Sequence, residues 1–493
     1  MTIRRILAAS LLLATASSAA LAAATDEEAA RITTSLQAYL GKEPGVVKVE
    51  PKGDDYIVTL DAAPYIAKIQ TPGVKVNVDP VVLTIRPKGN GQWDVAQKGS
   101  FNFGWDAEGF STVTAKVAEQ DWTGVFDEAS ASFLTSTYSI KNMSINQVMT
   151  DPTTKAKTTA SSVYDGWSGN STATPRADGS VDATSNISVT NVVSTSSTDM
   201  PGGQPLAYTI NAGKTDSTAT AKGLRSKAIL DLLAWFVEHP SKDLIIKDQQ
   251  QLKDKVLAAL PLWESLESSS AMSNMAVTTG IGNFALPAAN VSVGLSGASK
   301  DGRLREAFGV TGFALPPGIS PPWTEGLIPS TMKIDFTLDG VDLESPVKLF
   351  LTQADLSKDP VIPAGSEMAY MAAFAPNNSM KITLADGEFT SPTYSLTYEG
   401  AFNVNFMGLP TGTATIKMKG LDDVIAKVQA AAATDPTAQQ AMGGLVAFKG
   451  FGKADADGTT TWAIDLTQPG KLLVNGIDLS AMAGMAPPPA PAQ

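Results

Sequence analysis

Histidine and cysteine, which most often carry proton transfer, thiol attack and transition-metal binding, are almost absent from this chain. His239 is the one histidine among 493 residues, and there is no cysteine. His239 follows the stretch A-W-F-V-E and precedes Pro240, which disfavours helical geometry at the residue before it. An imidazole at this position commonly caps a helix C-terminus. We therefore predict that His239 ends a helix and has no catalytic role. The composition also excludes zinc, iron and copper sites of the usual His/Cys type.

Motifs for serine nucleophiles are incomplete. The nearest approach to G-x-S-x-G is G-L-S-G-A at 294–298, which lacks the second glycine in place. Ser345 and Lys348 spell S-x-x-K, a pairing found in penicillin-recognising enzymes, but the surrounding residues predict β-structure and not a helix start, and no K-T-G follows. No glycine-rich phosphate loop follows a strand and opens a helix. We predict no catalytic residue, no metal site and no cofactor.

Carboxylates and aromatic side chains leave two alternatives open. The stretch D-A-D-G at 455–458 resembles part of a calcium loop, but it lacks the closing glutamate and is better explained as a hairpin turn. A glycosidase-type acid pair stays open because acids are plentiful. Several aromatic residues could stack on sugar rings, although their strand spacing favours the core. They are Trp93, Phe101, Phe103, Trp105, Phe110 and Trp122.

The first residues predict export. M-T-I-R-R is followed by an apolar run from Ile6 to Leu13 and by Ala20-Leu21-Ala22, a secretory signal with an A-x-A cleavage site, so 1–22 is predicted to be removed. Loss of its two arginines changes the net charge from −12 to −14. An acidic chain without a basic stripe argues against nucleic-acid binding. No later segment is apolar enough to cross a bilayer, so no integral membrane segment is expected after cleavage. We expect a periplasmic or extracellular protein.

Alternation of apolar and polar residues predicts mostly antiparallel β-structure with one apolar and one wet face per strand. It occurs at Tyr56, Val58 and Leu60, at Val74, Val76 and Val78, at Ile334, Phe336 and Leu338, at Tyr394, Leu396 and Tyr398, and at Phe402, Val404 and Phe406. Asp-Gly at 165, 178, 301, 339, 386 and 457 and Asn-Gly at 90 and 475 predict hairpin turns. The Ser/Thr-rich region 151–221 is predicted to form long exposed strands, because Val181, Ala183, Ile187, Val189 and Val193 share one parity.

Helical patterns interrupt the strands. They cover Asp26 to Leu40, Leu224 to Glu238, Gln249 to Leu266, Leu421 to Ala433 and Ala438 to Phe448. Because helix pairs twice precede hairpins, we predict an α+β fold of repeated helix-pair and β-meander units whose amphipathic sheets curve. The predicted regions are a signal at 1–22, a helix and β-rich part at 23–222, a helix pair and β-rich part at 223–420, a helix pair and hairpin at 421–480, and a disordered Ala/Pro tail at 481–493.

The C-terminal stretch G-K-L-L-V-N-G-I-D-L, residues 470–479, contains the pattern L-x-V-N-G-x-x-L. In this the chain resembles large exported β-rich proteins of Gram-negative bacteria that are classed as domains of unknown function. It also has a distant architectural likeness to AsmA-type envelope proteins with lipid-handling grooves. The resemblance implies an envelope location and brings no catalytic residues.

These features favour a non-enzymatic envelope protein that holds a lipid or another apolar ligand in a β-lined groove. A carboxylate-based hydrolase or binder of envelope glycans is the alternative, and a scaffold that binds an envelope protein partner also fits the pattern. The residues predicted to line the groove are Phe402, Val404, Phe406, Ile334, Phe336 and Leu338.

Overall fold

The structure, a computed structural model, describes residues 23–68, 72–200, 202–406 and 408–480. The predicted signal at 1–22 and the predicted tail at 481–493 lie outside the described residues. The chain forms two compact units. Unit 1 contains the chain up to Ser268 with 277–280 and 347–364, and unit 2 contains 269–276, 281–346 and the chain from Gly365. The domain boundaries that we predicted from the sequence stay predictions.

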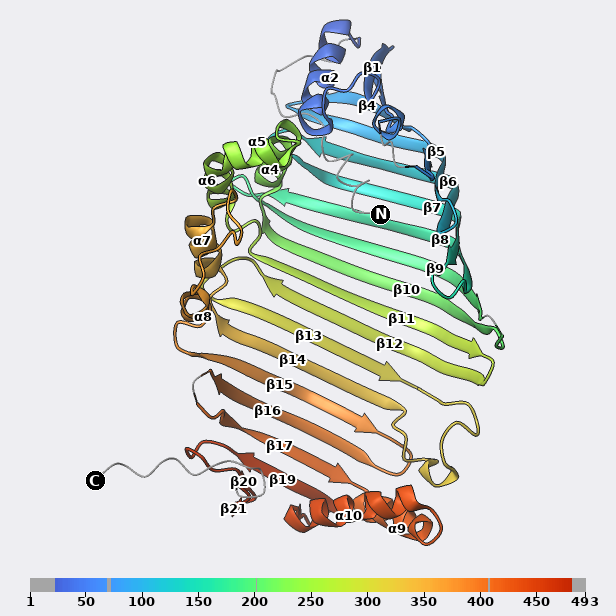
Figure 1. Ribbon diagram of the computed structural model, residues 1–493, viewed down its shortest axis with the longest axis vertical. Coiled ribbons are helices and arrows are strands. Elements are labelled where there is room, and N and C mark those ends of the chain that lie inside the picture. The colour runs from blue at the N-terminus through green and yellow to red at the C-terminus, as the bar shows by residue number, and fades with distance from the viewer. Residues whose placement is uncertain (1–22, 69–71, 201, 407, 481–493) are drawn as a thin grey trace, which may run out of the picture. The chain divides into compact units, whose positions relative to one another are not determined.

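Unit 1 is an antiparallel sheet with helices at its N-terminal end and after its last strand (Figure 1). Its strands are β1 (Val47–Lys52), β2 (Asp55–Leu60), β3 (Val74–Val78), β4 (Val81–Gly89), β5 (Gln92–Ala107), β6 (Ser111–Asp127), β7 (Ser132–Thr150), β8 (Lys157–Pro175), β9 (Val181–Asp199) and β10 (Leu206–Leu224). Its helices are α2 (Asp26–Leu40), α3 (Ala63–Ile66), α4 (Ser226–Glu238), α5 (Lys242–Lys247) and α6 (Gln249–Ala259).

The unit 1 sheet pairs its strands in the order β1, β2, β4, β5, β6, β7, β8, β9 and β10, and β3 pairs with the second half of β5. Strands β7 to β10 are each 19 residues long, about 60 Å at the usual rise. The prediction of long strands in the Ser/Thr-rich region is thereby confirmed.

Helix α2 closes the core of unit 1, and its predicted bounds are confirmed. The Thr25 hydroxyl accepts a hydrogen bond from the Glu28 N–H at 3.2 Å, and Gly41, with φ of 86°, ends the helix. Ile32 and Leu36 are fully buried against the sheet. Burial of such side chains stabilises a fold by about 1.5–3 kcal/mol each.

The long strands share an irregularity at their centre. Among the described pairs of β6 to β10, one position at the centre of each strand is skipped, and of these Asn142 and Asn191 have φ of 52° and 49°. The Asn191 Nδ2 donates to Asp165 Oδ2 at 3.0 Å. Apolar positions change parity at this column, from Ile140 before it to Met143 after it, so one face stays apolar. The skipped positions are Ala118, Asn142, Asp165, Asn191 and Gly213.

The skipped position in β9 corrects one detail of the prediction for this strand. Four of the five residues that share one parity lie before Asn191 and project from one face of the sheet: Val181, Ala183, Ile187 and Val189. Val193 lies after Asn191, so it projects from the other face, where it is exposed.

Unit 2 is also built of antiparallel strands, with two helices packed at its C-terminal end (Figure 1). Its elements are β12 (Gly282–Ser296), β13 (Gly302–Thr311), the short helix η1 (Pro322–Thr324), β14 (Thr331–Val341), α8 (Glu367–Phe374), β15 (Ser379–Thr390), β16 (Ser395–Asn405), β17 (Thr411–Lys419), α9 (Leu421–Ala432), α10 (Pro436–Phe451), β18 (Lys453–Ala454), β19 (Thr459–Asp465), β20 (Leu473–Val474) and β21 (Ile477–Asp478). Strand β11 (Ser265–Thr279) and helix α7 (Glu344–Gln353) contain residues of both units.

The pairing of unit 2 runs β12, β13, β14, β15, β16, β17, β19 and β20, with β18 also on β19 and β21 on β20. Its core lies where α9 and α10 pack against β17 and β19. Trp462 is buried there, stacks on Phe448 with ring centroids 4.0 Å apart and donates its indole N–H to the Phe448 carbonyl at 2.8 Å.

Most of the predicted turns occur, and three do not. Asn90, Asp178, Asp301, Asp457 and Asn475 each lie between two strands. The Asp-Gly pairs at 165, 339 and 386 lie inside strands β8, β14 and β15. In the pair at 386, the glycine serves close packing within the strand and not a turn, because a side chain on Gly387 would overlap the ring of Tyr398 on the neighbouring strand.

The helices are predicted with partial success. The second central helix ends at Ala259 and not at Leu266, because Pro261 disfavours helical geometry at Leu260, and β11 begins at Ser265. Helices α3, α5, α7 and α8 were not predicted. The fold is mostly antiparallel β, as expected, whereas the repeat of helix pairs and meanders is not confirmed. No helix in the described part of the chain is long and apolar enough to cross a membrane.

Candidate functional site

Strands β13 to β16 of unit 2 place apolar side chains in rows across one face. Leu304 lies opposite Leu338, Leu338 opposite Ile382, and Ile382 opposite Phe402. Directly opposed residues of antiparallel strands project from the same face, with Cβ atoms about 5 Å apart. All four side chains are partly exposed. We call this side of the sheet the apolar face of unit 2.

A second row runs beside the first. Phe336 lies opposite Glu306 on β13 and opposite Leu384 on β15, and Ile334 lies opposite Phe308. Ile334 and Phe308 are 38% and 42% exposed, which is high for large apolar side chains on a sheet. Glu306 is an exposed carboxylate within this row. The apolar face therefore reaches water and carries one acid among its apolar residues.

The structure brings five of the six predicted ligand residues onto this face. Ile334, Phe336 and Leu338 come from β14, and Phe402 and Val404 from β16, two strands away. Phe406 lies just beyond the end of β16, where its backbone N–H donates to the Asn378 carbonyl at 2.9 Å, and its ring is exposed. Their role as ligand residues stays a prediction.

Some residues of the apolar face were not predicted from the sequence, and most of them lie on β15, between β14 and β16. Ile382, Leu384 and Met380 of β15 complete the rows, and their alternation in S-M-K-I-T-L is the same signal that identified β14. Leu304 and Phe308 of β13 were missed because Glu306 interrupts their alternation.

The opposite face of β13 and β14 is polar. The Arg305 guanidinium donates to both oxygens of Asp335, from Nε at 3.1 Å and from Nη2 at 2.7 Å. These bonds hold the pKa of Asp335 below its usual range, although burial opposes the shift. Thr337 is buried on the same side. Polar contacts thus occupy one face while apolar side chains meet water on the other.

Unit 1 has an apolar face of the same kind. Trp122 lies opposite Tyr138, and Ile140 opposite Trp167, across β6, β7 and β8. The Trp167 indole N–H donates to the Tyr138 hydroxyl at 3.3 Å, and burial raises the pKa of Tyr138. Aromatic side chains with one polar atom suit such partly wet surfaces.

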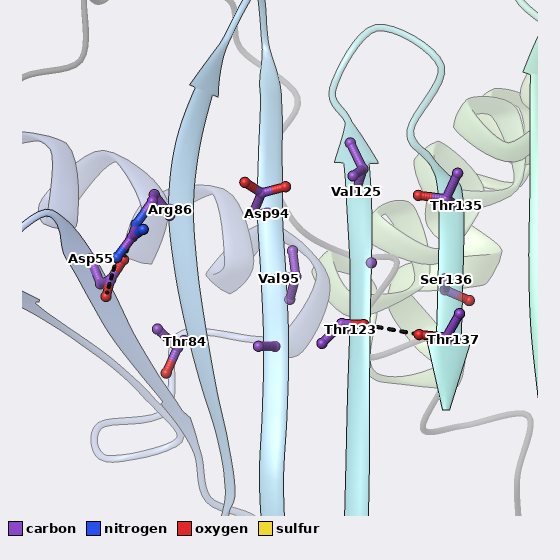
Figure 2. Close-up of a pocket in the computed structure, with 12 residues that line it drawn as sticks. Asp55, Thr84, Arg86, Asp94, Val95, Thr123, Val125, Thr135, Ser136 and Thr137 are labelled. Carbon is purple, nitrogen blue, oxygen red and sulfur yellow. Dashed lines mark hydrogen bonds and ion pairs between the residues drawn. The ribbon is translucent and has the colours of Figure 1, made fainter. Parts of the chain in front are cut away.

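A hollow of about 530 Å³ lies on the polar face of unit 1 (Figure 2). Arg86 and Asp55 pair across β2 and β4 at its edge, with Nε and Oδ1 2.6 Å apart. On β6 and β7, the Thr123 and Thr137 hydroxyls are 3.0 Å apart. This hollow is shallow and rich in hydroxyl groups, and it contains none of the six predicted ligand residues.

His239 ends helix α4, as predicted. Its Nδ1 lies 2.7 Å from the Trp235 carbonyl oxygen, and its ring stacks on the Trp235 indole with centroids 3.9 Å apart. Its Nε2 lies 3.2 Å from Asp248 Oδ2, a partner that the sequence did not indicate. Both ring nitrogens are therefore engaged by the protein.

The environment of the S-x-x-K motif was predicted wrongly. Ser345 and Lys348 lie in the first turns of helix α7 and not in β-structure. The Asp342 carboxylate caps this helix by accepting from the Ser345 N–H at 2.7 Å and from its hydroxyl at 2.6 Å. The Ser345 hydroxyl therefore donates a hydrogen bond to the carboxylate that caps the helix.

The other proposed sites have structural explanations. Trp93 and Phe101 are buried, so they belong to the core and not to a sugar-stacking platform. Asp455 and Gly458 form the turn between β18 and β19, where the Gly458 N–H donates to the Asp455 carbonyl at 3.2 Å. In the part of the chain that the structure describes, no group of three or more His, Asp or Glu side chains is arranged to hold a metal ion.

Comparison with protein families gives one match. Residues 268–480 match the model of a family described as an uncharacterized protein conserved in bacteria (DUF2125). Over these residues the chain is similar to a family without an assigned function. The expectation of such a family is confirmed, and the matched residues cover unit 2 as far as residue 480 together with 277–280 and 347–364. Comparison with curated proteins and with solved structures gave no match.

Proposed function

We propose that this protein is a non-enzymatic binding protein, and that the apolar face of unit 2 holds an acyl chain or a ligand of similar apolarity. The observation that carries the proposal is the row Leu304, Leu338, Ile382 and Phe402, in which four apolar side chains from four strands lie side by side and remain partly exposed. Covering such a surface with an apolar ligand releases about 25 cal/mol per Å² removed from water.

The sequence of β13 to β16 supports a surface adapted to binding. A sheet that only fills a core buries its apolar side chains, whereas Phe308 and Ile334 remain exposed here. The apolar face also crosses four strands, β13 to β16, so a ligand can contact several apolar side chains at once. An extended chain lying across the strands contacts one row of side chains along its path.

Export is part of the proposal. It rests on the N-terminal sequence, in which two arginines precede an apolar run and a small-residue cleavage pattern. We place the mature protein in the periplasm, where a carrier of acyl chains meets lipids from both membranes of a Gram-negative envelope. Expression in such a bacterium, cell fractionation and N-terminal sequencing of the mature chain test this location.

Displacement of a fluorescent fatty acid from the mature protein tests the binding function. We expect saturable binding that unlabelled long-chain fatty acids or phospholipids displace and that short-chain acids do not. Binding that increases without saturation, or that a Phe402→Ser variant retains in full, would contradict the proposal.

A further inference from the structure

The two ends of the unit 1 sheet are built differently. At one end, the turn from β6 to β7 is covered, because Ser130 and Ala131 are buried and Phe126 packs with Leu230 of α4 in the core of the unit. The Ser132 hydroxyl also donates to the Ser226 hydroxyl at the start of α4 at 3.0 Å. Helices and core residues therefore occupy this end.

At the other end, the turns after β5 and β9 and the strand residues next to the turns after β7 and β9 carry large exposed apolar side chains. The exposed fractions are 48% for Phe110, 41% for Met149, 52% for Met200 and 68% for Leu206. Turns are normally polar because they face water. Four large apolar side chains at one end of one sheet therefore call for a partner that removes them from water.

Hydrogen bonds and strand register place these residues along one edge. The Thr150 N–H, next to Met149, donates to the Phe110 carbonyl at 2.8 Å, which joins the turn after β5 to the end of β7. Met149 lies opposite Thr158, and the Thr158 and Thr198 hydroxyls are 2.9 Å apart. Thr198 in turn lies opposite Leu206. This row crosses β7 to β10, so we call the end formed by Phe110, Met149, Met200 and Leu206 the apolar edge of unit 1.

The charges at the apolar edge decide which partner fits. Lys157 lies directly opposite Asp199, and Lys155 lies in the same turn as Asp151, so each cation has an acid beside it. Attraction to an anionic lipid surface needs a cluster of unopposed cations. Glu108, in the same turn as Phe110, adds a further exposed acid, so the edge has no excess of cations. Apolar tips of this kind instead fit an uncharged surface, into which Phe, Met and Leu side chains can insert while their turn backbones stay at the head-group level.

We propose that the apolar edge of unit 1 docks on the surface of an uncharged, zwitterionic lipid bilayer. The four side chains enter the outer part of the bilayer, and the strands behind them stay in water. This docking goes beyond ligand binding, since it assigns the membrane as a partner whether or not unit 2 carries a lipid.

Flotation of the mature full-length chain with phosphatidylcholine vesicles tests the docking. We expect the protein to float with these vesicles, and the triple variant Phe110→Ser, Met200→Ser and Leu206→Ser to lose at least tenfold in bound fraction. Val446→Ser removes an equally exposed apolar side chain from α10 and is expected to float like the parent protein. Added phosphatidylserine should not increase binding. Failure of the parent protein to float, or equal losses in the triple and control variants, would overturn the proposal.

Site-specific labelling gives a second measurement that does not depend on the triple variant folding. Because the chain contains no cysteine, Leu206→Cys and Val446→Cys each accept one environment-sensitive fluorophore. We expect a blue shift on vesicle addition at position 206 and none at 446. No shift at 206, or the same shift at both positions, would overturn the docking. Fatty-acid displacement in the absence of vesicles reports on the proposed function separately, so either proposal can fail alone.

Discussion

Leu338 of β14 and Phe402 of β16 lie on the same face of the unit 2 sheet, and Ile382 of β15 lies opposite both. The three side chains form one continuous apolar row, although 64 residues of sequence separate the first from the last. Only strand pairing brings them together. This relationship turns two separate amphipathic strands into one surface on which an apolar ligand can lie.

Replacing the ends of this row should weaken ligand binding more than it weakens the fold. Leu338→Ser and Phe402→Ser each remove apolar contact with the ligand, and we expect each to reduce affinity for a long-chain fatty acid about tenfold, equivalent to about 1.4 kcal/mol. Because both side chains are partly exposed, the loss of folding stability should be smaller than for a buried residue. Isothermal titration gives the affinity and thermal unfolding gives the stability.

Glu399→Gln is the matched control for this pair. Glu399 is an exposed residue of β16 and, by strand alternation from Phe402, projects from the opposite face. Its replacement should leave affinity unchanged. Equal losses in Glu399→Gln and Phe402→Ser would show that the ligand does not use the apolar face.

Asn142 should be sensitive to the shape of its replacement. Its φ of 52° is accessible to asparagine and glycine but costs a β-branched residue about 1–2 kcal/mol. We expect Asn142→Val to be destabilised by about that amount and Asn142→Gly to stay close to the parent protein, as measured by urea unfolding. If both variants lose the same stability, the lost amide and not the backbone conformation determines this position.

Gly387 should not tolerate a methyl group. A Cβ at this position would overlap the Tyr398 ring, and relief of such overpacking typically costs about 1–3 kcal/mol. Gly450→Ala adds the same methyl group in helix α10, where no atom lies near it, and should be neutral or stabilising. Tyr398→Leu should recover part of the Gly387→Ala loss. No recovery in that double variant would show that the strain lies in the backbone.

The ion pair of Arg305 and Asp335 should give a pH-dependent contribution to stability. Because Arg305 lowers the pKa of Asp335 in the folded state, the contribution is fully present above the unfolded pKa of about 3.9 and disappears as pH falls through the lower folded pKa. We expect Asp335→Asn to be less stable than the parent protein by about 1–3 kcal/mol at pH 7. That difference should shrink between about pH 5 and pH 2. A difference that stays constant over this range would contradict the assigned role of the pair.

Local signals in the sequence are enough to place α2, and those of α7 were not recognised. In α2, the cap at Thr25, the acids of the first turn and the stop at Gly41 all agree. In α7, Pro346 lies in the first turn, where proline is tolerated, and Asp342 before the helix caps it. Asp342, two residues before the helix start, and Pro346 in the first turn are the local signals from which this helix could be predicted.

The candidate surface could be predicted only in part. Alternation identified the apolar positions of β14 and β16, since each strand carries its own periodic signal. It did not show that Ile382 joins them, because register depends on long-range pairing. The parity change at Asn142 and Asn191 was also invisible, because a left-handed residue interrupts the alternation on which the prediction rests.

Native mass spectrometry of the mature full-length protein, purified gently from its own cells and followed by solvent extraction, tests the central claim most directly. The binding function predicts a stoichiometric lipid-sized mass on the parent protein, reduced or absent in a folded Leu338→Ser and Phe402→Ser double variant and retained in Glu399→Gln. A ligand-free mass for the parent protein, or the same bound mass in all three proteins, would contradict it.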